Sequence, residues 1–173
     1  MDKIEYIIIH HSATKKETTN FNAVNEYHLS LGWKGIGYHY FIEEDGTVKQ
    51  GRDENTEGAH CRSDRMNHRS IGICLAGNFT EEEPSVGQLA SLQSLLDLLR
   101  KRYDIPRENV LGHKEVNGAS TVCPASLLDH IKAYRQGEDE NNDTRAISEE
   151  LDEALKHISL ARESVEKIIE MLK

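Results

Sequence analysis

Apolar and polar positions along this chain follow two different periods, one typical of strands and one typical of helices. Near the start, Ile7, Ile8 and Ile9 are consecutive β-branched residues, as expected for a strand buried on both faces. Asp45-Gly46 is a hairpin signal between two further apolar runs. The sequence thus predicts strands in the ranges 4–11, 38–42, 47–50, 71–76 and 110–111.

Three other segments are predicted to be helical. Apolar residues recur at helical spacing in the first two, Thr18, Thr19 and Asn20 are available N-caps for the first, and Pro124 opens the third. The middle stripe is formed by Val86, Leu89, Leu92, Leu96 and Leu99. Helices are therefore predicted over 18–31, 85–103 and 126–134, and the polar stretch 52–69 is predicted to be a long functional loop. Alternating strands and helices predict an α/β fold, with a mixed, mainly parallel central sheet flanked by helices.

Composition and charge limit the classes of function that this chain can have. A chain of 173 residues can hold one well-buried domain and an appendage. Its formal net charge of −9 argues against nucleic acid as a partner. There is no basic segment followed by an apolar stretch at the N-terminus and no apolar run long enough to span a membrane. We therefore expect synthesis in the cytoplasm without a signal peptide.

The last 37 residues differ from the rest, with five Lys/Arg against eleven Asp/Glu. We predict a domain over 1–136, an acidic linker over 137–146 and an amphipathic, coiled-coil-like helix over 147–173. The apolar seam of that helix steps alternately by four and three residues from Ile147 to Leu172. This predicts a homo-oligomer formed through 147–172, and the alternative is packing of the same seam on the domain.

Candidate metal ligands occur in two islands. His10 and His11 end the first predicted strand, and the segment Leu111–Pro124 supplies His113 and Cys123. One of the paired histidines with His113 and Cys123 makes a three-ligand zinc set whose fourth position is left for water. The alternatives are histidines that only cap a core strand, or a closed structural site. A fourth protein ligand for a closed site would come from His11, His60, Cys61 or Lys114.

A second ambiguity concerns the strand predicted over 38–42. Period-two alternation places Tyr38, Tyr40 and Ile42 on one face, and His39 and Phe41 on the other. Tyr38 and His39 are therefore expected to point in different directions, so that only one of them reaches a shared site.

Four motifs carry a resemblance to a known family. IIIHHSAT, GIGYHYFIEEDGTVKQGRDENTEGAHC, NHRSIGICLAGNF and GHKEV…CP stand in the order found in zinc-dependent N-acetylmuramoyl-L-alanine amidases. Over about residues 2–136 the chain most resembles the branch of phage-type amidase lysozymes and peptidoglycan recognition proteins. The resemblance implies His10, His113 and Cys123 as zinc ligands and Tyr38 as the catalytic partner. Cys123 favours this branch over the similar recycling amidases, which carry an acidic third ligand.

The resemblance also implies further site residues. Thr121 stands where many phage-type relatives have a lysine, so its hydroxyl can donate a hydrogen bond to the oxyanion without adding positive charge. His60, Asn67 and Ser70 lie in the segment that lines the substrate groove in similar proteins, and they are candidates for substrate binding.

The implied reaction is hydrolysis of the amide bond between N-acetylmuramic acid and L-alanine in peptidoglycan, with zinc-bound water as the nucleophile. A non-catalytic peptidoglycan-binding protein is the alternative, but such proteins usually lose a zinc ligand. A third hypothesis is that the protein serves in assembly through its C-terminal helix. The enzyme would act on the cell wall after release or delivery, as a phage lysis protein or an injected toxin, or would serve as a recycling enzyme.

Overall fold

A single five-stranded sheet organises the computed structural model, which describes residues 3–137. The strand order is β3-β2-β4-β1-β5. β1 pairs in parallel with β4 and β5, β2 pairs in parallel with β4, and β3 joins β2 in an antiparallel hairpin. The predicted mixed, mainly parallel sheet is thus confirmed. The strands are β1 (Tyr6–His11), β2 (Tyr40–Ile42), β3 (Val48–Gln50), β4 (Ser70–Leu75) and β5 (Val110–Gly112).

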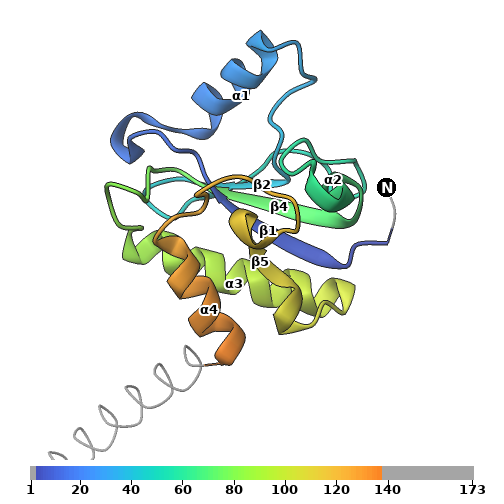
Figure 1. Ribbon diagram of the computed structural model, residues 1–173. Helices are drawn as coiled ribbons and strands as arrows, with labels where there is room; N and C mark the ends of the chain where they lie inside the picture. Colours follow the sequence, from blue (N-terminus) through green and yellow to red (C-terminus); the bar gives the residue numbers. More distant parts are fainter. Residues whose placement is uncertain (1–2, 138–173) are drawn as a thin grey trace, which may run out of the picture. The chain divides into compact units, whose positions relative to one another are not determined.

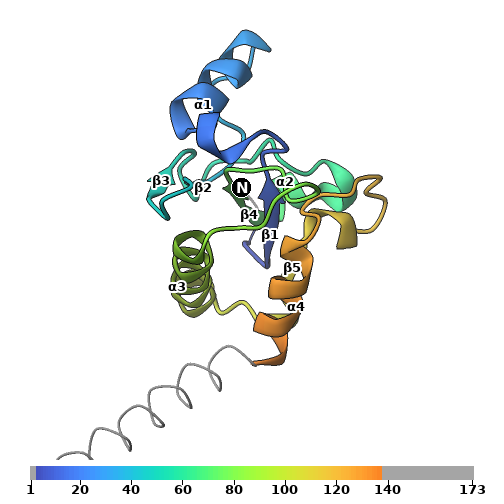
Figure 2. The same cartoon turned by 90° about the vertical axis from the view of Figure 1, so that its left-hand side faces the viewer.

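Helices cover both faces of this sheet. In Figures 1 and 2, α3 and α4 lie together on one face, and α1 and α2 lie on the other. The α-helices are α1 (Phe21–Ser30), α2 (Met66–Arg69), α3 (Val86–Tyr103) and α4 (Leu127–Gln136). Short 3₁₀ turns occupy Lys16–Thr18 (η1), Ser63–Arg65 (η2), Arg107–Asn109 (η3) and His113–Glu115 (η4). The stretch 52–69, predicted to be loop, therefore ends in a 3₁₀ turn and a short helix.

The core is divided between the two faces by the side-chain alternation of β1. Ile7 and Ile9 belong to the main cluster, together with leucines of α3 and α4. Ile8 belongs to a second cluster on the opposite face, where it meets Cys61 and Met66. Because strand side chains alternate, His11 continues the side of Ile7 and Ile9, and His10 continues the side of Ile8. The two adjacent histidines therefore face different layers of the protein.

Helix α3 corrects one detail of the predicted stripe. Val86 is 85% exposed, whereas Gln88, which the apolar pattern did not include, is fully buried. Gln88 takes this place because its amide is satisfied twice: Oε1 accepts the N–H of Ser85 at 3.0 Å, and Nε2 donates to the carbonyl of Ala76 at 2.8 Å. The Ser85 hydroxyl in turn accepts the N–H of Gln88, which completes a capping box.

We expect Gln88→Ala to lower the free energy of unfolding by about 1–3 kcal/mol, because it leaves the buried Ala76 carbonyl without its donor. Chemical denaturation measures this change. Val86→Ala is the matched control in the same turn and should stay within about 0.5 kcal/mol of the wild type. Equal effects of the two substitutions would contradict the assignment of Gln88 as the buried anchor of α3.

A buried carboxylate anchors the loop that follows β3 to the end of α3. Glu54 accepts hydrogen bonds from the hydroxyls of Tyr40 and Tyr103, and Arg102 Nη1 donates to both of its oxygens at 2.6 and 2.9 Å. Burial raises the pKa of Glu54, but these hydrogen bonds outweigh burial and hold the pKa below its ordinary value. Glu54 therefore fixes the position of the first part of the loop that leads to the predicted substrate-binding residues.

Two predictions concern residues outside the described part of the chain. The linker from residue 138 onward and the helix over 147–173 lie there, so the linker, the helix and its self-association stay predictions. Within residues 3–137, none of the helices combines the length and apolarity required to cross a membrane.

Candidate functional site

Three metal-ligating side chains converge at one edge of the sheet. His10 lies near the end of β1, His113 directly follows β5, and Cys123 precedes α4. Their ligand atoms all lie within 4.8 Å of one another, and His10 Nδ1 is 3.8 Å from Cys123 Sγ. β1 and β5 are parallel neighbours, so the residues that follow them emerge at the same edge. The structure thus brings together the three predicted ligands.

Backbone hydrogen bonds hold the cysteine against the two histidine segments. The N–H of Lys114 donates to the carbonyl of Cys123 at 2.7 Å. The N–H of His11 points at Cys123 Sγ, 3.4 Å away. The N–H of Cys123 itself donates to the hydroxyl of Thr121 at 3.1 Å. Residues from β1, η4 and the loop before α4 are therefore locked into one unit around the thiol.

Burial sets the protonation of these groups. It raises the pKa of Cys123 to about 12, although the N–H of His11 works in the opposite direction. Burial is also the main cause that lowers the pKa of His10 well below its ordinary range, and the neighbouring imidazoles of His60, His113 and His11 add to it. Burial lowers the pKa of His113 as well, so the neutral imidazole, which has a lone pair for a metal, is favoured at both ligand histidines. A divalent cation would displace the thiol proton.

This donor set fits zinc. Two imidazole nitrogens and one sulfur are among the ligands that zinc prefers, and bonds of about 2.0–2.3 Å separate tetrahedral ligand atoms by about 3.3–3.8 Å. The 3.8 Å between His10 Nδ1 and Cys123 Sγ lies at the upper end of that range. Among residues 3–137, no fourth His, Cys, Asp or Glu joins the group. A site with three protein ligands is of the open, catalytic type rather than the closed, structural type.

The alternative ligand His11 is engaged elsewhere. Its Nδ1 accepts the N–H of Phe79 at 3.1 Å, and its ring lies against the ring of Phe79 with the centroids 5.9 Å apart. The choice between His10 and His11, which the residues alone left open, is made by the face of β1 that each occupies.

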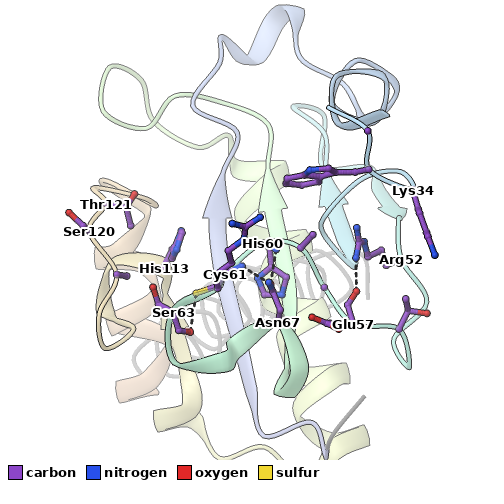
Figure 3. Close-up of a pocket in the computed structure, with 17 residues that line it drawn as sticks. Lys34, Arg52, Glu57, His60, Cys61, Ser63, Asn67, His113, Ser120 and Thr121 are labelled. Carbon is purple, nitrogen blue, oxygen red and sulfur yellow. Dashed lines mark hydrogen bonds between the residues drawn. The ribbon is translucent and has the colours of Figure 1, made fainter. Parts of the chain in front are cut away.

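A pocket of about 860 Å³ opens beside His113. Figure 3 shows its labelled side chains, with Thr121 and His113 at one end and Lys34 and Arg52 at the other. The wall also includes the predicted residues His60 and Asn67. The charged residues of the wall are predominantly cationic: Lys34, Arg52 and Arg62 against the single carboxylate of Glu57.

Two of the substrate-binding candidates have clear structural contacts. Asn67 Oδ1 accepts the N–H groups of both His60 and Cys61 at 2.8 Å, so this side chain holds the loop that forms the wall. Ser70 is fully buried and donates its hydroxyl to the carbonyl of Met66 at 2.6 Å. The structure does not bring Ser70 to the pocket wall.

Tyr38 lies next to the metal ligand His10, as the resemblance implies, but not on the same face as Tyr40. Its ring centroid is 5.3 Å from that of His10, and the side chain packs against the cluster that contains Phe41 and Cys74. Tyr40 instead packs with the main core. The predicted shared face of Tyr38 and Tyr40 is therefore wrong, because β2 begins only at Tyr40 and the backbone bends at the residues before it. Alternation applies only within the extended strand.

His39 also departs from its predicted direction. It is fully buried, and its ring lies 5.6 Å from that of His60, so it borders the same group of histidines. Its Nδ1 accepts the N–H of Gly72 at 2.9 Å, which leaves the proton on Nε2, 3.0 Å from the carbonyl of Thr56. Both ring nitrogens of His39 thus form hydrogen bonds with backbone groups.

The sequence patterns did not single out Trp33 as a wall residue. Its indole lines the pocket and stacks on His28, with the ring centroids 4.5 Å apart and an interplanar angle of 25°. His28 Nδ1 accepts the N–H of Gly37 at 3.1 Å, which fixes the turn just before Tyr38. The available signal was a lone tryptophan in a glycine-rich loop directly before the Tyr38 motif.

The fold and the site together define a class of protein. It has a mixed α/β sheet, a His-His-Cys group able to bind a metal at the carboxyl ends of its parallel strands, and an adjoining pocket. Such a centre, with three protein ligands and one open position, is typical of metal-dependent hydrolases.

The family is shown by comparison with known proteins. Residues 1–126 match the model of the Amidase_2 family, N-acetylmuramoyl-L-alanine amidase, and the chain belongs to this family. It is a peptidoglycan amidase, an enzyme that hydrolyses the bond between N-acetylmuramic acid and L-alanine. The predicted resemblance to this family is confirmed.

Individual relatives support the same assignment. The endolysin of Escherichia phage T7 is 35% identical over 130 residues, which cover 72% of this chain and 82% of the relative. Peptidoglycan-recognition protein SC2 of Drosophila melanogaster is 36% identical over 133 residues, covering 72% and 70%. The structure of N-acetylmuramoyl-L-alanine amidase LysC from Clostridium intestinale URNW superposes with a TM-score of 0.68 at 35% identity, covering 76% of this chain and 85% of that one.

Proposed function

We propose that the protein hydrolyses this peptidoglycan amide with one zinc ion held by His10, His113 and Cys123. The observation that carries the proposal is the convergence of their three ligand atoms beside an open pocket. Zinc, when bound, supplies a Lewis acid that acidifies water and polarises the scissile carbonyl. The thiolate contributes one negative charge to the centre and the imidazoles none, so the bound metal would keep a net positive charge.

Tyr38 acts in this proposal as a hydrogen-bond donor. Burial is the main cause that raises the pKa of its phenol well above the ordinary value, and nearby Cys74 and Cys123 add to it. A protonated phenol beside the ligand His10 is suited to orient the attacking water or to donate to the developing oxyanion. Thr121 accepts the N–H of Cys123, which leaves its own hydroxyl proton for the same oxyanion.

The pocket wall suits an acidic glycopeptide. Lys34 and Arg62 are exposed cations on the wall of a protein whose total charge is −9. We propose that they attract the carboxylates of the stem peptide, and that His60 and Asn67 shape the wall against which the peptide lies. The action on cell wall fits the similarity to a phage endolysin.

Mass spectrometry of purified peptidoglycan after digestion tests this function. We expect stem peptides with a free L-alanine amino group and intact glycan strands. Products should vanish after chelation and return with zinc. Cleavage of a glycosidic bond, or of a bond within the peptide, would overturn the proposed reaction, and unchanged activity after complete metal removal would overturn the metal's role.

A second candidate is binding of peptidoglycan without cleavage, which the similarity to a peptidoglycan-recognition protein favours. The same assay separates the two functions, because a binding protein would cosediment with the cell wall and release no fragments. The retained Cys123 and Tyr38 support the enzyme.

A further inference from the structure

His60 makes a direct contact with a proposed zinc ligand. Its Nδ1 lies 3.1 Å from Nε2 of His10, and the two rings meet edge to face with an interplanar angle of 79°. His10 therefore has its two ring nitrogens on different partners, with Nδ1 towards Cys123 Sγ at 3.8 Å and Nε2 towards His60.

The surroundings of His60 hold its ring in one orientation. A Cβ atom on Gly58 or on Gly72 would lie 2.4 Å from His60 Cδ2, so these two positions form a slot that only glycine leaves open. Asn67 fixes the backbone at the same point by accepting the N–H groups of His60 and Cys61. Figure 3 shows the side chains of His60 and Asn67 next to each other.

The contact assigns protons once His10 is a ligand. A metal on Nδ1 uses the lone pair of that atom, so the proton of the neutral imidazole must sit on Nε2. This N–H can only donate to Nδ1 of His60, which must then be the acceptor and carry its own proton on Nε2. A hydrogen bond from the far nitrogen of a ligand histidine fixes its tautomer and its ring orientation, usually with a carboxylate or carbonyl as acceptor.

We propose that His60 is a positioning residue for the metal ligand His10, with an imidazole in the place of the usual acceptor. The inference rests on the proposed zinc site and deepens it. It differs from the substrate-binding role predicted for His60, because neither ring nitrogen faces the pocket. Nδ1 lies against His10, and Nε2 is buried and lies towards the backbone of Ser70.

Three substitutions of His60 test this role, with zinc affinity measured by competition against a chromophoric chelator. His60→Ala should weaken zinc binding by about 10–100-fold, because the acceptor is lost. His60→Asn places an amide oxygen near the position of Nδ1 and should restore most of the affinity. His60→Gln carries the same amide one methylene further out and should behave as His60→Ala. Absorption spectra of the cobalt-substituted proteins should change in the same order.

His68→Ala is the matched control. This histidine lies in the same segment but is partly exposed and pairs with Glu57 at 3.3 Å, so its replacement should leave zinc affinity unchanged. If His60→Ala does not fold, the Asn and Gln variants decide the question, and equal zinc affinities and cobalt spectra in these two would overturn the proposal. A raised KM with wild-type zinc affinity would overturn it in favour of substrate binding. Failure of the wild-type protein to bind zinc would instead overturn the proposed function itself.

Discussion

Replacing His10 by alanine should abolish zinc binding and amidase activity together, whereas the same change at His11 should abolish neither. His10 belongs to the three-ligand group, but His11 Nδ1 is used by the N–H of Phe79. Structural zinc sites are worth about 10–16 kcal/mol over four ligands, or about 2.5–4 kcal/mol per ligand, so one lost ligand corresponds to about a 70–900-fold loss of affinity. Elemental analysis after dialysis and release of stem peptides from peptidoglycan measure the two effects.

His11→Ala is an informative control because it should change the stability of the protein without changing its zinc content. It should lower the free energy of unfolding by about 1–3 kcal/mol, since the buried N–H of Phe79 loses its acceptor. The protein should still hold one equivalent of zinc and remain active at a temperature below its unfolding transition. Loss of zinc from His11→Ala with retention in His10→Ala would reverse the assignment of the ligand.

The second large effect is expected from Tyr38→Phe, which should retain zinc and lose about 10²–10³-fold in kcat. The substitution removes only the phenolic hydroxyl, and losses of this size follow from deleting one donor to a developing oxyanion. The ring stays packed against the cluster that contains Phe41 and Cys74, so His10 should not be disturbed. The lost hydrogen bond with the Cys74 side chain should lower the free energy of unfolding by only about 1 kcal/mol. Steady-state kinetics with a soluble muropeptide, together with zinc analysis, separate turnover from metal content.

Tyr40→Phe is the matched control for Tyr38→Phe. The Tyr40 hydroxyl donates to Glu54, away from the metal ligands, so this change should affect stability and leave kcat within about twofold. A Tyr38→Phe enzyme with full turnover and bound zinc would show that the phenol has no part in the reaction.

Much of the fold could be predicted from local patterns. The run from Ile7 to Ile9 predicted a strand buried on both faces, and β1 is such a strand. The Asp-Gly turn predicted the hairpin that joins β2 and β3. These features are local because propensity, alternation and turn chemistry act between residues close in sequence. Errors arose where a distant partner decided burial, as for Gln88, whose amide meets the carbonyl of Ala76.

Local sequence patterns could not predict how the side chains of the site are arranged. Alternation predicts that His10 and His11 point to opposite faces of β1, but not which face carries a pocket. That is decided by α3 and α4, whose leucines cover the side of Ile7, Ile9 and His11. His10 is left on the face where the segment 58–61 packs. The bend before Tyr40, which turns Tyr38 towards His10, likewise depends on His28 accepting the N–H of Gly37.

By itself, the sequence determined the class of chemistry: two histidines, a cysteine and a tyrosine in ordered motifs, on an α/β pattern. It could do so because ligand identity and motif order are properties of the chain. Only the tertiary structure decided which histidine joins the cysteine, that Asn67 holds the wall and Ser70 lies off it, and that His60 meets His10 through Nδ1. These outcomes depend on the packing of segments far apart in sequence, since contacts between such segments determine which side chains are buried and which ring nitrogens find partners.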